Sequence, residues 1–146
     1  MSTYRFTVDI EPIGKARPRM TRNGHVYTPK ETREAELAIS MAYELFRGRL
    51  IEKGVPVSLD VIAYFPIPQS WSNIKKMAVM DGDILPTKKP DADNILKLVA
   101  DALNGEAYED DAQVVDMSIS KRYRREVAKP GYLDIVVTAY DGEEDT

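Results

Sequence analysis

Apolar and polar residues alternate along four stretches of the chain, and this two-residue period is typical of strands with one buried face. In the first stretch, Tyr4, Phe6 and Val8 alternate with Arg5 and Thr7. The pattern therefore predicts four strands. They are expected over residues 4–10, 57–65, 113–119 and 133–139.

Apolar residues recur at intervals of three and four in two longer stretches, which predicts two main amphipathic helices. The first helix is expected to start at the sequence Thr28-Pro29-Lys30-Glu31, because this is a capping box with proline at the first helical position. It is expected to continue to about Phe46 or Leu50. The residues expected on its buried side are Ala35, Leu37, Ala38, Met41, Ala42, Leu45 and Phe46.

The second main helix is expected to start at Asp91, as its N-terminal cap, and to end before Asn104-Gly105. A shorter helix is expected over about residues 72–80, in a proline-bracketed region. The apolar side of the second main helix comprises Ile95, Leu96, Leu98, Val99, Ala102 and Leu103.

The order of these elements predicts an α+β fold, with a small mixed β-sheet packed against two main helices. The 146 residues are the size of one domain, expected over residues 1–140, followed by an acidic tail, residues 141–146, that is expected to be disordered. The absence of cysteine excludes disulfides and cysteine-ligated metals. No stretch is long and apolar enough to cross a membrane, so we expect a cytoplasmic protein with no membrane partner.

Carboxylates concentrate between Lys88 and Asp116. Asp93, Lys97 and Asp101 follow one another at intervals of four, so their side chains are expected to form one polar line on the second main helix. Clustered carboxylates attract a cation, and oxygen ligands suit Mg²⁺ or Mn²⁺. The acidic turn at residues 109–111 approaches the start of this helix only if the connection doubles back.

The same spacing admits a plainer interpretation. Asp91 is then only a helix cap, Asp93 and Lys97 form a surface pair, and the acidic turn is simply solvated.

The net charge of −4 is carried entirely by four carboxylates of the acidic tail, so the rest of the chain is neutral. Its basic residues are bunched, as binding to phosphate backbones requires. One group lies in a loop that is expected to contain a type I′ hairpin turn at Asn23-Gly24, and a second group is expected in another loop. The residues expected to contact DNA are Lys15, Arg17, Arg19, Arg22, Lys88, Lys89, Lys121, Arg122, Arg124 and Arg125.

Several motifs of this chain resemble the signature of the RusA family of Holliday junction resolvases. They are Pro90-Asp91-Ala92-Asp93-Asn94, Lys97, Asp101-Ala102-Leu103-Asn104-Gly105 and Asp110-Asp111-Ala112-Gln113-Val114, with a weaker match at Gly14-Lys15-Ala16-Arg17-Pro18-Arg19 and Tyr27-Thr28-Pro29.

The resemblance implies roles for individual residues. It implies that Asp91, Asp93 and Asp111 bind a divalent metal and that Lys97 is catalytic, with Asp110 left as an alternative ligand to Asp111. It also implies a compact mixed fold and a homodimer, because a four-way junction is cut twice with approximate two-fold symmetry.

We therefore expect a Mg²⁺-dependent endodeoxyribonuclease, with Mn²⁺ as a possible substitute, that resolves four-way junction DNA by paired symmetric nicks in recombination and repair. Asn94 and Asp101 are candidates for orienting the catalytic side chains, and no small-molecule cofactor is expected. Three alternatives remain open at this point: a non-catalytic branched-DNA-binding module, a more general flap or branched-DNA nuclease, and a nucleotide phosphohydrolase.

Overall fold

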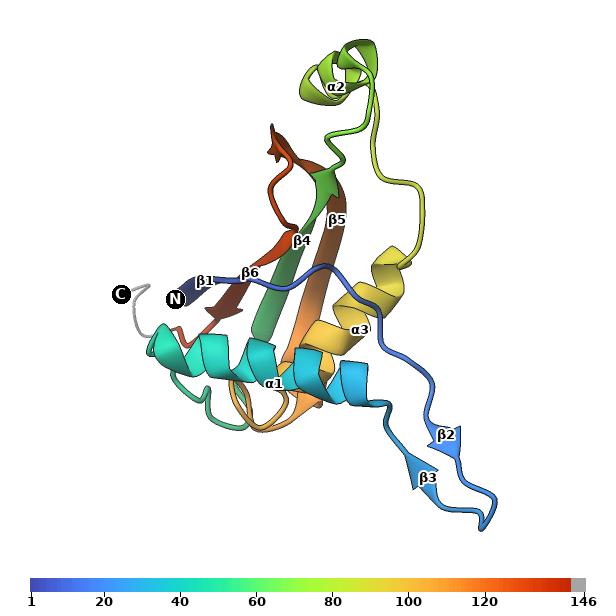
Figure 1. Cartoon of the computed structure of the whole chain (residues 1–146). Helices are drawn as coiled ribbons and strands as arrows, with labels where there is room; N and C mark the ends of the chain where they lie inside the picture. The colour runs from blue at the N-terminus through green and yellow to red at the C-terminus, as the bar shows by residue number, and fades with distance from the viewer. Residues whose placement is uncertain (143–146) are drawn as a thin grey trace.

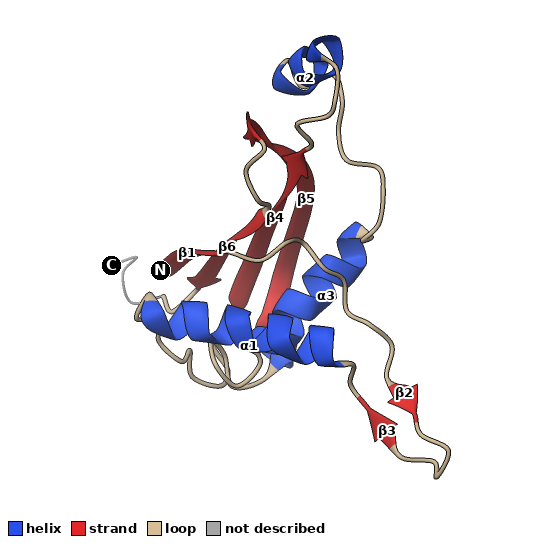
Figure 2. Ribbon diagram, in the orientation of Figure 1, coloured by secondary structure: helices blue, strands red, loops and turns tan. Residues whose placement is uncertain are grey.

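The computed structural model describes residues 1–142 (Figures 1 and 2). The expected disorder of the acidic tail concerns residues 141–146, of which 143–146 lie outside the described residues. The elements are β1 (Ser2–Val8), β2 (Arg19–Met20), β3 (Val26–Tyr27), α1 (Lys30–Leu45), β4 (Val57–Ile67), α2 (Asn73–Met80), α3 (Ala92–Leu103), a 3₁₀ helix η1 (Asp111–Gln113), β5 (Val114–Val127) and β6 (Tyr132–Ala139).

Four strands form one mixed sheet in the order β1-β6-β4-β5. β6 pairs antiparallel with both β1 and β4, whereas β4 and β5 are parallel. Both α1 and α3 lie against one face of this sheet (Figure 2). The predicted α+β fold with a small mixed sheet and two main helices is thus confirmed. In the part of the chain that the structure describes, no helix is long and apolar enough to span a membrane.

Strand β4 shows how the sheet divides the chain between a buried face and an open one. Leu59, Val61 and Ala63 are fully buried beneath the helices. The residues between them point to the opposite face, where Asp60 is exposed and Tyr64 is half-buried. This is the two-residue period expected of a strand with one covered face.

Helix α3 forms as its apolar period predicts. Its N-terminal cap is Asp91 and its last helical residue is Leu103. Ile95, Leu98 and Val99 are fully buried. Because the apolar stripe faces the sheet, the polar line on the other side of the helix is left at the surface.

Helix α1 buries only part of the face predicted for it: Ala35 is buried and Ala38 and Ala42 pack against the core, as predicted. Its buried residues are Thr32, Ala35, Ile39 and Tyr43. The rings of Tyr4 and Phe6, on β1, pack edge-on against the ring of Tyr43 and so select this face. The expected core positions that are instead exposed are Leu37, Met41, Leu45 and Phe46.

The predicted capping box at the start of α1 does not form. Pro29 is the N-terminal cap, and no side chain bonds to the free N–H groups of the first turn. The carbonyl of Pro29 accepts a hydrogen bond from the N–H of Arg33 at 3.1 Å, so the helix begins one residue later than the box requires.

The predicted hairpin exists, but its turn is not of type I′. Gly24 has a positive φ of 82°, whereas Asn23 is not among the residues with positive φ. The N–H of Gly24 donates to the carbonyl of Thr21 at 3.0 Å, which places Arg22 and Asn23 at the centre of the turn. A type I turn followed by a left-handed glycine gives this pattern. The β2–β3 hairpin projects away from the sheet (Figure 1).

The second basic group lies on a strand and not in a loop. β5 continues to Val127, because it pairs with β4 from Val114 to Tyr123 and again, after a register shift, at Val127 with Ile67. Charged residues do not prevent a strand when a long neighbour supplies its hydrogen bonds. In the regularly paired part of β5, Lys121 and Arg122 therefore point to opposite faces of the sheet.

The face that α1 buries can be tested with two isoleucines. We expect Ile39→Ala to lower the free energy of unfolding by about 2–5 kcal/mol, since Ile39 is fully buried. Ile74→Ala, at a residue of α2 that is 83% exposed, is the matched control and should change it by less than about 0.5 kcal/mol. Urea unfolding measures both, and equal effects would contradict the observed packing.

Candidate active site

The exposed face of α3 carries the first three predicted site residues. Asp91, Asp93 and Lys97 are all exposed. The Asp91 side chain makes no capping hydrogen bond although it occupies the cap position. Within the described residues, no salt bridge joins Asp93 to Lys97. Asp91 thus occupies the cap position of the plainer interpretation without a capping hydrogen bond, and the surface pair of Asp93 and Lys97 is not formed among the described residues. All three side chains are at the surface and accessible to a ligand.

A cavity of about 380 Å³ opens beside the start of α3. Its wall includes Lys15, Lys89, Asp91 and Asn94. Lys89, beside Asp91 in this wall, suits a phosphate group whose neighbouring atoms react at that carboxylate.

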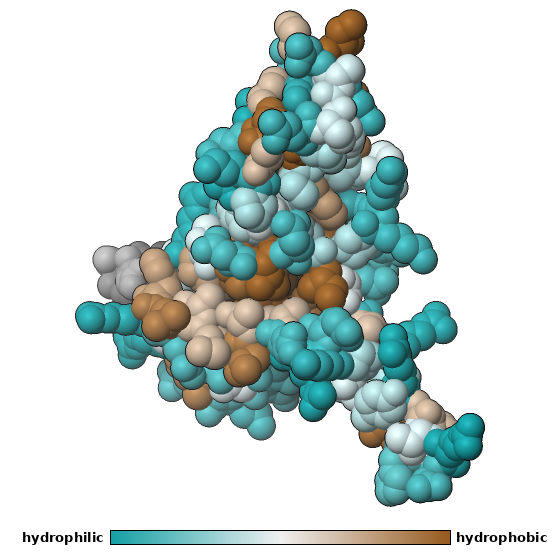
Figure 3. All heavy atoms as spheres, viewed as in Figure 1, coloured by the Kyte–Doolittle hydropathy of each residue, from teal (hydrophilic) through white to brown (hydrophobic). Residues whose placement is uncertain are grey.

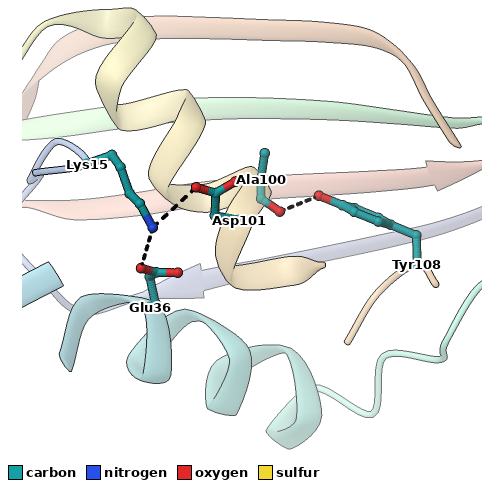
Figure 4. A network of polar contacts seen from close by, with 5 residues as sticks. All are labelled: Lys15, Glu36, Ala100, Asp101 and Tyr108. Carbon is teal, nitrogen blue, oxygen red and sulfur yellow. Dashed lines mark hydrogen bonds and ion pairs between the residues drawn. The ribbon is translucent and has the colours of Figure 1, made fainter. Parts of the chain in front are cut away.

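Asp111 lies at the other end of α3. The connection after the helix turns back tightly, and the Tyr108 hydroxyl donates to the carbonyl of Ala100 at 2.6 Å (Figure 4). The pKa of Asp111 is raised, chiefly by its side-chain hydrogen bond with Asp110. The nearby charge of Asp101 contributes to the same shift. The connection thus brings Asp111 to Asp101 and not to the start of the helix.

The two adjacent aspartates have different surroundings. The Asp110 carboxylate accepts a hydrogen bond from the N–H of Ala112 at 3.1 Å, within a capping box that Gln113 completes. That backbone hydrogen bond is the largest cause lowering the pKa of Asp110. Asp110 therefore holds the 3₁₀ helix together, which leaves Asp111 as the freer carboxylate of the pair.

The predicted metal ligands do not converge within this chain. Asp93 and Asp101 are two turns apart, which corresponds to about 12 Å along the helix axis. Across residues 1–142, no three carboxylate or histidine side chains are grouped closely enough to hold a metal ion. The donor chemistry of Asp91, Asp93, Asp110 and Asp111 suits Mg²⁺, but their arrangement in one chain does not fit a single site.

Lys15 joins three parts of the molecule (Figure 4). Its Nζ lies 2.8 Å from Oε1 of Glu36 on α1 and 3.2 Å from Oδ2 of Asp101 on α3. Its backbone N–H donates to the carbonyl of Asn94 at 3.0 Å. Desolvation alone would lower the pKa of Lys15, but hydrogen bonds to Glu36 and Asp101 outweigh it and raise the pKa.

Lys15 is accordingly a supporting residue more than a free cation for DNA. The backbone of its neighbour Gly14 passes so close to α3 that a Cβ there would lie 3.0 Å from the Cβ of Asn94. Glu36 was not among the predicted residues, and its sequence separation from Lys15 gives no periodic signal that links the two.

The other predicted DNA contacts fall into three places, and all are exposed except Lys121 and Arg124, which are half-buried. Arg17, Arg19 and Arg22 lie on the loop and hairpin that project beyond α3 (Figure 1). Lys88 and Lys89 precede α3.

The basic group of β5 is divided between the two faces of the sheet. The Nζ of Lys121 donates to the carbonyl of Lys88 at 2.6 Å, on the side of α3. Arg122 is paired with Tyr64 and is oriented to the open face, where Arg124 lies over the ring of Tyr132. Arg125 lines the same pocket as these two arginines.

Comparison with known proteins adds two findings. The family model described as Endodeoxyribonuclease RusA matches residues 9–129, which include every predicted site residue. An uncharacterized protein of Bacillus subtilis (strain 168), YqaN, is 42% identical over 131 residues, covering 86% of this chain and 92% of that protein.

The role of Lys15 can be tested against another lysine. We expect Lys15→Ala to lower the free energy of unfolding by about 1–2 kcal/mol, because it leaves Glu36 and Asp101 facing each other without a cation. Lys30→Ala removes an exposed pair with Glu34 and should cost less than about 0.5 kcal/mol. If urea unfolding showed no difference between the two variants, the network would not support the fold.

Proposed function

Because the chain belongs to the RusA family of endodeoxyribonucleases, we propose that it is a Holliday junction resolvase, which cuts four-way DNA junctions by paired nicks in recombination and repair. The observation that carries the proposal is the exposed row of Asp91, Asp93 and Lys97 on α3, beside a cavity lined by Lys15 and Lys89. This row is what phosphodiester hydrolysis needs: carboxylates beside a cation at the surface.

The basic residues around α3 support binding of the DNA backbone on two sides of that row. Arg17, Arg19 and Arg22 are on the projecting hairpin side, while Lys88, Lys89 and Lys121 lie at the approach to α3. Phosphate contacts on both sides hold the strand in register across the helix. We assign these contacts to positioning, since they carry no information about base sequence.

In the proposed reaction, each side chain has a simple electrostatic task. Lys97 neutralises negative charge that develops on the phosphoryl oxygens. Asp91 and Asp93 accept hydrogen bonds from the attacking water and so orient it toward phosphorus. Asp101 lies one helical turn after Lys97 on the same face of α3, where its ion pair with Lys15 fixes its position. We assign it to orienting the row of catalytic side chains.

We propose that cleavage requires Mg²⁺, for which Mn²⁺ substitutes, because carboxylate oxygens are the ligands that these ions prefer. We assign no coordination geometry, since the four aspartates do not meet within one chain.

A homodimer is the second part of the proposal, because paired cuts need two sites related by a two-fold axis. The exposed residues Leu37, Met41 and Leu45 form an apolar stripe along α1. Figure 3 shows apolar side chains gathered over α1 on the face viewed. A stripe with a four-residue repeat packs well against a second copy of itself, and this supports α1 as the contact between the two subunits.

The proposed activity is tested by cleavage of a labelled four-way junction in Mg²⁺, with linear duplex and flap DNA as substrate controls. We expect Asp93→Asn to lower junction cleavage at least about 100-fold while junction binding persists, because it removes an orienting carboxylate. Asp116→Asn, at an exposed aspartate of β5, is the matched control and should cleave as the unmodified protein does.

Each other outcome selects a different function. Binding without cleavage in either Mg²⁺ or Mn²⁺ would indicate a non-catalytic branched-DNA-binding module. Equal cleavage of flap and junction would indicate a general branched-DNA nuclease. Hydrolysis of nucleotides at a rate that DNA does not affect would indicate a phosphohydrolase.

The dimer contact is tested by placing a charge in the stripe. We expect Met41→Glu to shift the chain from dimer to monomer in sedimentation equilibrium, because the substitution buries a charge at the centre of the contact. Ile74→Glu, on the exposed surface of α2, is the control and should leave the mass unchanged. A Met41→Glu variant that remains dimeric would exclude this face.

A further inference from the structure

The open face of the sheet holds a second pocket, of about 420 Å³, at the end of β4 and β5. The residues that define it are Tyr64, Tyr132, Arg122, Arg124, Arg125 and Glu126, and we call it the tyrosine–arginine pocket. Tyr64 alternates along β4 with the buried residue Ala63, so the pocket lies on the face opposite to α3. The row of Asp91, Asp93 and Lys97 takes no part in it.

Two stacked tyrosines form the base of this pocket. Tyr64 and Tyr132 are direct partners in the β4–β6 register. Their ring centroids are 4.6 Å apart and their planes differ by 19°. Cross-strand pairing from a sheet holds both rings in place, so the aromatic surface exists before any ligand arrives.

Arg124 is fixed over this aromatic pair. Its guanidinium carbon lies 5.0 Å from the centroid of the Tyr132 ring. Its Nη1 donates to the carbonyl of Pro130 at 2.9 Å, and its Nη2 lies 3.3 Å from Oε1 of Glu126. With only 25% of the side chain exposed, Arg124 is part of a built wall and not a mobile surface cation.

Arg122 and Arg125 supply charge at the mouth of the pocket. Both are exposed. Nη1 of Arg122 donates to the carbonyl of Lys121 at 3.0 Å, which orients the guanidinium and leaves its other N–H groups for a ligand. The pocket is lined by three arginines and one carboxylate, that of Glu126. Its net charge is therefore positive, which favours binding of an anion.

We propose that the tyrosine–arginine pocket binds one unpaired nucleotide of DNA, whose base stacks on the guanidinium plane of Arg124, which the Tyr64–Tyr132 pair supports, and whose phosphate contacts Arg122 and Arg125. Aromatic rings and arginine planes are the surfaces on which unstacked bases are bound, whereas a paired base inside a duplex already has both faces covered. The volume is within the range of small-ligand pockets and holds one nucleotide, not a duplex. The inference rests on the proposed action on DNA, and it adds a preference for unpaired DNA at a site away from α3.

The test compares two DNA forms in the absence of divalent metal, so that binding is measured without cleavage. Fluorescence anisotropy follows a labelled single-stranded oligothymidylate and a duplex of equal length. We expect Tyr132→Leu to weaken single-strand binding about 10-fold or more and duplex binding less than about 2-fold, because leucine removes the ring on which the Arg124 guanidinium is held for stacking. Tyr132→Phe is the matched control and should retain single-strand binding.

A second variant guards against a folding defect in Tyr132→Leu. Arg124→Met keeps the aliphatic stem and removes the guanidinium, and it should weaken single-strand binding by a similar factor. Equal losses on single strand and duplex, or no loss in either variant, would overturn the pocket. Junction cleavage is measured separately. If cleavage is found but the variants bind single strands normally, the pocket is excluded and the proposed function stands. If the variants lose single-strand binding but no junction is cleaved, the pocket stands and the proposed function is excluded.

Discussion

The parallel pairing of β4 with β5 is the constraint on which the rest of the structure depends. Two parallel neighbours cannot be joined by a tight turn, so the chain must return from the end of β4 to the starting end of the sheet before β5 begins. α3 makes that return with its apolar side on the sheet, which leaves Asp91 and Asp93 at the surface. Because β5 then runs back along α3, its first residues lie at the helix C-terminus, and this separates Asp111 from the start of the helix.

The same arrangement brings two carboxylates together, and Lys15 neutralises them. Crowded carboxylates repel, and a fold that places Glu36 of α1 near Asp101 of α3 needs a cation between them. Lys15 takes that position and draws the N-terminal loop against α3. The loop in turn carries Arg17 and Arg19 past the helix. One ion-pair network thus joins the two helices and sets where the basic hairpin departs, while Asp91 and Asp93 remain uncompensated and open to a ligand.

The fold class, the four strands of the sheet and α3 were predictable from the sequence, because each has a single apolar face that periodicity identifies. The buried face of α1 was predictable only at its alanines, because the helix has apolar residues on two sides. Contact with Tyr4 and Phe6, far away in sequence, decides that Tyr43 is buried and Met41 is exposed. The basic run of β5 was predicted as a loop for a related reason. A run of charges is typical of a loop, but here the long partner strand β4 supplies hydrogen bonds that keep it in a strand. The distance between the aspartates depends on the direction of a crossover, which no local pattern encodes.

The basic residues of β5 lie on both faces of the sheet. Lys121 joins Lys88 on the side of α3, while Arg122 and Arg124 join the stacked tyrosines on the open face. β5 is also an edge strand, so DNA that crosses this edge meets both faces within a few residues. A branched DNA presents paired arms and, at the branch point, bases that have lost a stacking neighbour. Under the two proposals, phosphate contacts near α3 hold a paired arm while the tyrosine–arginine pocket binds a base released at the branch. Selectivity for a junction then follows from occupying both faces at once, which an intact duplex cannot do.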